Sequence, residues 1–182
     1  MPPPDGFTST ACAIAGTSRS ARWALSTEPV TEAQAQAVED AFPEQGPLVG
    51  ILVGSDSDRP AMEAAMEELD AHGISWEFNV LSAHRNPRAV AEYASAASLR
   101  GLRVLIAGAG LAAALPGVLA AHTELPVIGV PLRATMSVLD GLDALLAIVQ
   151  MPPGVPVACV GVDNSRNAAV LAARMLGSRG GG

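Results

Sequence analysis

From residue 47 onward, five short apolar runs alternate with stretches of helical periodicity. The runs are rich in Val and Ile, which favour buried strands, and they span residues 47–53, 75–81, 103–109, 126–130 and 156–162. Strands that alternate with helices form parallel sheets, because a parallel connection needs a long crossover. The sequence therefore predicts an α/β fold in which helices cover both faces of a five-stranded parallel sheet.

Three of the intervening helices have recognisable ends. Residues 59–72 place apolar side chains on one stripe and are followed by Gly73, a typical helix stop. Asn86 can cap the next helix, which Gly101 ends, and a last helix is expected over residues 165–177.

The composition excludes several classes of function. The chain has 182 residues, 11 Lys and Arg against 18 Asp and Glu, and no basic run, which argues against nucleic-acid binding. Cys12 and Cys159 lie far apart without metal-ligand spacing, so we expect neither a metal site nor a disulfide scaffold, and a cytoplasmic location. No apolar run reaches the roughly 20 residues that span a bilayer, so we expect no membrane partner.

The composition divides the chain near residue 45. Residues 46–182 are expected to form one domain, and residues 1–45 an N-terminal extension that is partly disordered or helical. Within the extension, residues 31–42 have helical spacing. Residues 6–27 contain two Arg, several Ser and Thr and no acid, which loosely matches a transit peptide; a loosely ordered extension is the alternative.

Ligands of such folds bind at the carboxyl ends of the strands. This rule selects three segments: GSDSD after the first strand, SAHR after the second, and GAGLAAALPG after the third. We therefore treat these segments as candidate parts of one site.

The GSDSD segment suits a phosphate. Gly54 permits close backbone approach, Ser55 and Ser57 offer hydroxyl donors, and the following helix offers free N–H groups. Asp58 can accept hydrogen bonds from sugar hydroxyls. The alternative is a plain turn with Ser57 or Asp58 as the helix cap. The segment is not a Walker loop, because the Gly-Lys-Ser/Thr ending is missing.

The SAHR segment carries acid–base chemistry. Strand alternation would point Ser82 and His84 to the same side. Histidine can carry a proton in either direction near neutral pH, and Arg85 can bind phosphate. The alternative is a surface histidine beside an arginine that balances nearby acids. A serine hydrolase is disfavoured, because no G-x-S-x-G motif occurs.

The third segment offers backbone rather than side chains. Gly108 and Gly110 would let a ligand lie against the main chain, although tight strand-to-helix packing explains the glycines equally well. The third glycine of a dinucleotide fingerprint and its downstream acid are absent. His72, His122 and Cys159 are expected to be structural or exposed residues.

Taken together, these segments resemble the N5-carboxyaminoimidazole ribonucleotide mutase (AIR carboxylase) family of purine biosynthesis. The resemblance covers about residues 48–176 and is carried by GSDSD, SAHRNP, IAGAGLAAALPG, LPVIGVPL and GLDALLAIVQMPPGVPVA. It implies a flavodoxin-like three-layer sandwich, assembled as a homo-octamer. It further implies an isomerase that moves a carboxylate from an exocyclic nitrogen to a ring carbon of an aminoimidazole ribonucleotide, through trapped CO2 and without metal or cofactor.

The resemblance also assigns roles to individual residues. It implies that His84 is the general acid–base. Ser55 and Asp58 match residues that hold the phosphate and ribose, and Ser82 and Arg85 match further phosphate contacts. The backbone of Ala109 and Gly110 matches the part that lies against the migrating carboxylate.

The chain departs from the family pattern in two places. Leu111 and Ala114 stand where the family usually has Gly and His, and residues 160–169, with Asp163 and Arg166, replace a longer Gly/Ala-rich loop. These departures leave two alternatives to the mutase. One is a paralogue that acts as a carboxylase or decarboxylase (a lyase) on another heteroaromatic nucleotide in specialised metabolism; the other is a non-catalytic nucleotide-binding module.

Overall fold

The computed structural model describes residues 46–177. The helix expected at 31–42 and the transit-peptide-like stretch at 6–27 lie outside these residues, and the division of the chain near residue 45 stays a prediction.

The predicted parallel sheet is confirmed. Its strands are β1 (Val49–Val53), β2 (Trp76–Val80), β3 (Val104–Gly110), β4 (Val127–Leu132) and β5 (Ala158–Cys159). All four strand pairs are parallel, and the spatial order is β2-β1-β3-β4-β5. This order is the flavodoxin-like one, in which the chain reverses direction across the sheet between β1 and β3.

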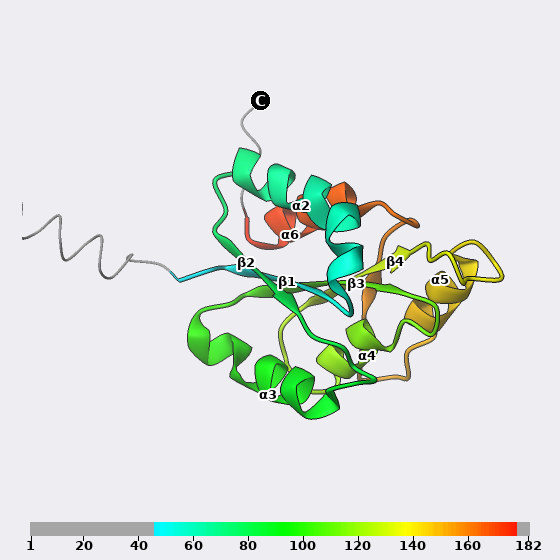
Figure 1. The fold of residues 1–182 in the computed structure, drawn as a ribbon. Helices are drawn as coiled ribbons and strands as arrows, with labels where there is room; N and C mark the ends of the chain where they lie inside the picture. Colours follow the sequence, from blue (N-terminus) through cyan, green and yellow to red (C-terminus); the bar gives the residue numbers. More distant parts are fainter. Residues whose placement is uncertain (1–45, 178–182) are drawn as a thin grey trace, which may run out of the picture. The chain divides into compact units, whose positions relative to one another are not determined.

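Helices cover both faces of the sheet in three layers (Figure 1). The described helices are η1 (Asp56–Asp58), α2 (Arg59–Ala71), α3 (Pro87–Ala97), η2 (Ser98–Arg100), α4 (Ala114–Ala120), α5 (Leu142–Val149) and α6 (Ser165–Met175). Helices α2 and α6 pack on one face, and α3, α4 and α5 pack on the other. No helix within residues 46–177 has the length and apolar character needed to cross a membrane.

The two hydrophobic clusters explain why the strands are continuous apolar runs. Along β1, Val49, Ile51 and Val53 belong to the cluster under α2 and α6, whereas Leu52 belongs to the cluster on the opposite face. Both faces of the central strands are therefore buried, which is the usual condition of a parallel sheet.

The predicted helix ends are also observed. The Asn86 side chain accepts a hydrogen bond from the backbone N–H of Ala89, so it caps α3 as expected. Gly73 (φ 63°) follows α2, and Gly101 (φ 94°) ends η2, in the left-handed region that glycine tolerates best.

The last strand is shorter than the sequence predicts. Only Ala158 and Cys159 of the run 156–162 pair with β4. Pro156 has no N–H to donate to a ladder. Beyond β5 the chain leaves the strand conformation, and the N–H of Asp163 donates to Pro131 O at 2.8 Å.

Candidate active site

The three candidate segments meet at one edge of the sheet. Strand β1 pairs with both β2 and β3, so the loops that follow these strands are neighbours. They line a cavity of about 90 Å³ that is open to solvent; its lining residues are Gly54, Asp58, Ser82, Ala83, His84, Ala109, Gly110, Ala113, Ala114 and Leu115. The expectation that the three segments form one site is therefore supported by their geometry.

Ser55 organises the loop after β1. Its hydroxyl accepts hydrogen bonds from the Ser57 N–H at 3.4 Å and from the Ser57 hydroxyl at 2.9 Å, so Ser55 caps η1. Asp58 occupies the cap position of α2 but makes no side-chain cap bond. The alternative with Asp58 as the helix cap is therefore right in position, but its carboxylate does not bond the first turn of α2. That carboxylate lines the cavity instead.

The environment of Asp58 is partly desolvated. Burial raises the pKa of Asp58 above its ordinary value, although hydrogen bonds from Ser57 and the Ser55 backbone and the charge of Arg85 act in the opposite direction. Within residues 46–177 the Asp58 carboxylate feels the charge of Arg85 but forms no salt bridge, so it is suited to accept hydrogen bonds from a ligand.

A turn, rather than a strand, presents the SAHR residues. Strand β2 ends at Val80, and the turn is held by hydrogen bonds from the Asn86 N–H to Ser82 O at 2.8 Å and from the Arg85 N–H to the Ser82 hydroxyl at 3.3 Å. Ser82 and His84 both line the cavity, as expected, but strand alternation is not the reason. The His84 side chain is exposed.

Arg85 joins the first two segments. Its guanidinium donates to Gly54 O at 2.5 Å. Arg85, Ser55 and Ser57 are not among the residues that line the cavity, but each contacts or adjoins a residue that does. The structure therefore gathers all the predicted polar residues around one opening.

The opposite wall is nonpolar. It consists of Ala109 and Gly110 at the end of β3 and of Ala113, Ala114 and Leu115 at the start of α4. Gly110 lies so close to β4 that a Cβ there would be 3.1 Å from Leu132 O and 3.4 Å from Ala134 Cβ. Sequence reasoning assigned Ala109 and Gly110 but missed Ala113 and Leu115 and noted Ala114 only as a departure. Small apolar residues carry no sequence signal of a binding site.

Other reactive side chains lie elsewhere. His72 Nε2 is 3.3 Å from a Glu68 carboxylate oxygen on α2, and His122 is exposed beyond α4. Burial raises the pKa of the Cys159 thiol, which keeps it protonated and unreactive. Within residues 46–177, no group of three His, Cys, Asp or Glu residues is arranged to hold a metal ion.

The cavity is thus chemically asymmetric. His84 and Asp58 are the titratable side chains among the described residues that line it, and the segment at the end of β3 and after it contributes only backbone and apolar side chains. An imidazole in this position can transfer a proton to or from a bound ligand. The nonpolar wall can accommodate a small neutral fragment without supplying a competing proton.

Comparison with known proteins identifies close relatives. A family described as AIR carboxylase matches residues 48–180. An N5-carboxyaminoimidazole ribonucleotide mutase from Pyrococcus horikoshii is 56% identical over 131 residues, which are 72% of this chain and 73% of the relative. A mutase of the same name from Thermotoga maritima is also 56% identical over 131 residues, 72% of this chain and 75% of the relative.

One further relative is a much longer protein, and one solved structure is less similar in sequence. A phosphoribosylaminoimidazole carboxylase from Saccharomyces cerevisiae is 57% identical over 132 residues, which are 72% of this chain but 23% of that protein. A crystal structure of Treponema denticola PurE superposes with a TM-score of 0.62 at 30% identity, covering 72% of this chain and 80% of that one.

Proposed function

Because the chain belongs to the AIR carboxylase family, we infer that it is an enzyme of purine biosynthesis that transfers a carboxylate on an aminoimidazole ribonucleotide. The reaction converts N5-carboxyaminoimidazole ribonucleotide into 4-carboxy-5-aminoimidazole ribonucleotide. The observation that carries this proposal is the cavity itself, which His84 lines together with Ala109 and Gly110.

His84 is proposed to move one proton in each half of the reaction. It first protonates the carbamate nitrogen, the nitrogen–carbon bond breaks with its electron pair left on nitrogen, and CO2 is released. The ring carbon then attacks CO2, and the proton displaced from that carbon returns to the imidazole. CO2 is small and neutral, so a closed nonpolar wall is needed to retain it beside the ring.

The polar residues at the opening are proposed to hold the nucleotide. Ser55, Ser57, Ser82 and Arg85 would bind the phosphate, and Asp58 would accept hydrogen bonds from the ribose. Arg85 supports this role, because its guanidinium has five N–H donors. Among residues 46–177 one carbonyl, that of Gly54, accepts from it. A phosphate could therefore bind without disrupting the contact between the two loops.

The experiment that tests the function follows the fate of the carboxylate. The purified protein is incubated with N5-carboxyaminoimidazole ribonucleotide, and the products are followed by absorbance and mass spectrometry. Ring-carboxylated product supports the mutase. Aminoimidazole with loss of CO2 would instead indicate a decarboxylase, and binding without turnover would indicate a nucleotide-binding module. The relatives do not favour the alternative of a paralogue with another substrate, because several are named as mutases.

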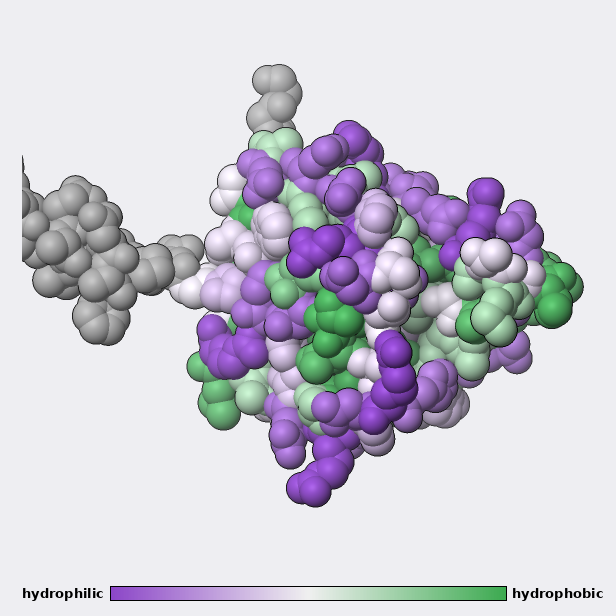
Figure 2. Space-filling model, in the orientation of Figure 1, coloured by the Kyte–Doolittle hydropathy of each residue, from purple (hydrophilic) through white to green (hydrophobic). Residues whose placement is uncertain are grey.

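We further propose that the enzyme is a cytoplasmic homo-octamer that binds neither nucleic acid nor membrane. An exposed apolar surface on the loop before α5 and on α5 supports assembly; it comprises Met136, Val138, Leu139, Leu142, Leu146 and Val149. Hydrophobic residues are visible in Figure 2 at the edge where this loop lies. Surfaces of this kind mark protein–protein contacts. The net charge of −7 and the lack of a basic cluster support the absence of nucleic-acid binding.

Light scattering tests the assembly. An octamer would have eight times the chain mass of 18.5 kDa. The double variant Leu142→Asp/Leu146→Asp is expected to lower the mass, whereas Leu99→Asp, at a position 91% exposed on η2, serves as the control. A monomeric mass for the unmodified protein would contradict the proposal.

A further inference from the structure

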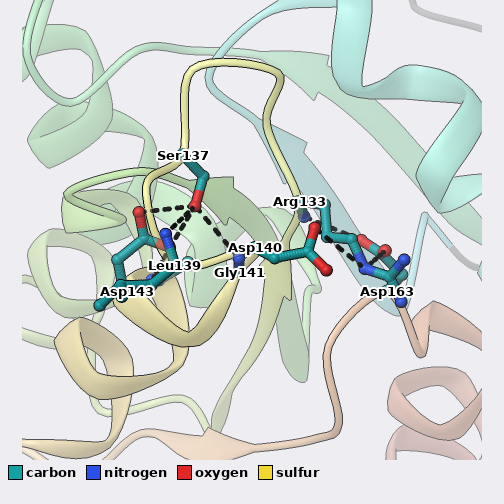
Figure 3. Close-up of polar contacts among 8 residues, drawn as sticks. Arg133, Ser137, Leu139, Asp140, Gly141, Asp143 and Asp163 are labelled. Atoms are coloured by element: carbon teal, nitrogen blue, oxygen red, sulfur yellow. Dashed lines mark hydrogen bonds and ion pairs between the residues drawn. The ribbon is translucent and has the colours of Figure 1, made fainter.

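Arg133 and Asp163 form a close pair at the edge of the sheet that carries the cavity (Figure 3). Arg133 directly follows β4, and Asp163 lies between β5 and α6. Arg133 Nε is 3.1 Å from Asp163 Oδ2, and the Arg133 backbone N–H donates to Asp163 Oδ1 at 3.0 Å. The two carboxylate oxygens of Asp163 thus bind the side chain and the main chain of the same residue.

Asp163 is itself fixed in an unusual conformation. Its φ of 56° lies in the left-handed region, and its N–H donates to Pro131 O at 2.8 Å. Such a residue persists only where its surroundings determine its position. The neighbouring Gly141 shows how closely the two loops pack, since a Cβ there would be 2.7 Å from Val162 Cγ1 and 3.2 Å from Arg133 Cγ.

The pair is connected to the nonpolar wall of the cavity by a single strand. Strand β4 pairs with β3 so that Pro131 lies opposite Ala109 and Leu132 lies opposite Gly110. Asp163 therefore holds the residues on both sides of Leu132, namely Pro131 through its carbonyl and Arg133 through its N–H and guanidinium. Asp163, in the loop between β5 and α6, therefore fixes the end of β4, which is the strand that pairs with Ala109 and Gly110.

We propose that Asp163, acting through Arg133, is a positioning residue that keeps the nonpolar wall closed while CO2 is held in the cavity. The inference rests on the proposed function. A neutral CO2 molecule offers no charge by which the site could hold it, so its retention depends on how tightly the wall is packed. Loss of the ion pair would leave the main-chain bond from Asp163 to Pro131 but loosen the end of β4, and the wall at Ala109 and Gly110 could then separate from it.

Escape of CO2 has a defined chemical consequence. Cleavage of the carbamate consumes one proton and leaves the free amine and CO2; attack by the ring carbon returns one proton and uses one CO2. If the original CO2 leaves before the attack, a molecule from solution can take its place. Product formed in a buffer of bicarbonate labelled with heavy carbon then carries the label, whereas direct transfer gives unlabelled product.

The test compares two variants that are matched in charge and conformation. Asp163→Asn removes the charge but keeps a side chain that tolerates a positive φ. Asp140→Asn is the control: Asp140 also has a positive φ (50°), but it is 3.9 Å from Arg133 Nε and its side chain is 84% exposed. Unlabelled substrate is converted in labelled bicarbonate, and the labelled fraction of the product is measured by mass spectrometry against a blank without enzyme.

We expect Asp163→Asn to raise the labelled fraction about fivefold, because it removes one well-oriented, half-exposed ion pair. Asp140→Asn should leave the labelled fraction unchanged. Each variant is used at a concentration that gives the same rate of conversion, so that exchange of the free carbamate with bicarbonate contributes equally and a loss of folded protein alone does not change the labelled fraction. Arg133→Met is expected to match Asp163→Asn, and the double variant should add nothing further, because both changes remove the same contact.

The outcomes separate the two proposals. Turnover by all variants with equal labelled fractions would overturn this inference and leave the proposed function intact. A labelled fraction raised equally by Asp140→Asn would also overturn it, since general loss of negative charge would then be the cause. No turnover by the unmodified protein would overturn the proposed function and this inference with it.

Discussion

Replacement of His84 by Asn tests the proposed chemistry most directly. Asn keeps a polar side chain of similar size and removes the ionisable group. Asp58 is the other titratable side chain among the described lining residues, and it is proposed to contact the ribose rather than the reacting atoms. General acid–base catalysis contributes about 10²–10⁴-fold. Because both proton transfers use the same imidazole, we expect a loss of kcat near about 10⁴-fold, or about 5.5 kcal/mol of transition-state stabilisation.

Substrate binding and folding should survive this change. The turn around His84 is held by Asn86 and Arg85, whose backbone N–H groups donate to Ser82, and the His84 side chain is exposed. The proposed phosphate contacts remain in place. We therefore expect KM to change by less than about threefold, which is the signature of an interaction made in the transition state rather than in the bound substrate.

The assay measures kcat and KM from product absorbance, together with calorimetric binding of the product nucleotide and a thermal melt. His122→Asn is the matched control, because His122 is also exposed but lies beyond α4, before the amino end of β4. A His84→Asn enzyme that keeps more than about a tenth of the normal kcat would refute the assigned role.

Two predictions concern stability. Burial raises the pKa of Asp58, so its ionised form is unfavourable in the folded protein. We therefore expect Asp58→Asn to increase the free energy of unfolding at neutral pH. This gain should shrink as the pH falls towards the ordinary pKa value of 3.8, because the carboxyl group is then protonated in both the folded and the unfolded state. Urea unfolding at several pH values checks this, and a gain that does not vary with pH would contradict it. Ser137→Ala should lower the free energy of unfolding by about 1–2 kcal/mol, because the hydroxyl donates to Asp143 at 2.8 Å and accepts from two N–H groups of its own loop. Ser95→Ala, which removes a single bond of 3.4 Å, is its control.

The fold could be predicted from the sequence where tertiary packing and local pattern agree. The central strands are buried on both faces, so they are continuous apolar runs. Glycines also mark where two helical segments stop: Gly73 follows α2, and Gly101 ends η2, which continues α3. Helices α4 and α5 could not be delimited, because they have seven and eight residues and lack side-chain caps. Helices this short depend on tertiary packing rather than on their own propensity.

The candidate site was more predictable on its polar side than on its nonpolar side, where only Ala109 and Gly110 were assigned. Polar residues that directly follow a buried strand are conspicuous, which is how GSDSD and SAHR were found. The nonpolar wall at Ala113 and Ala114 has the composition of ordinary core. The pairing of Arg133 with Asp163 joins residues 30 positions apart on different loops, and charged residues on loops have many possible partners.

Backbone conformation explains why local sequence rules fail at this edge of the sheet. Within residues 46–177, four residues other than glycine have a positive φ: Leu111, Ala113, Asp140 and Asp163. Leu111 and Ala113 follow β3, Asp140 follows β4 and Asp163 follows β5, so all four lie beyond the carboxyl ends of strands. Each residue in this conformation costs about 1–3 kcal/mol of folding free energy. A sequence pattern predicts helical or extended conformations for Leu and Ala instead. The strain must be offset by contacts such as the bond from the Ala113 N–H to Gly110 O. Ala113 lines the cavity together with His84, and strain at a functional site is a recognised reason why local sequence rules fail there.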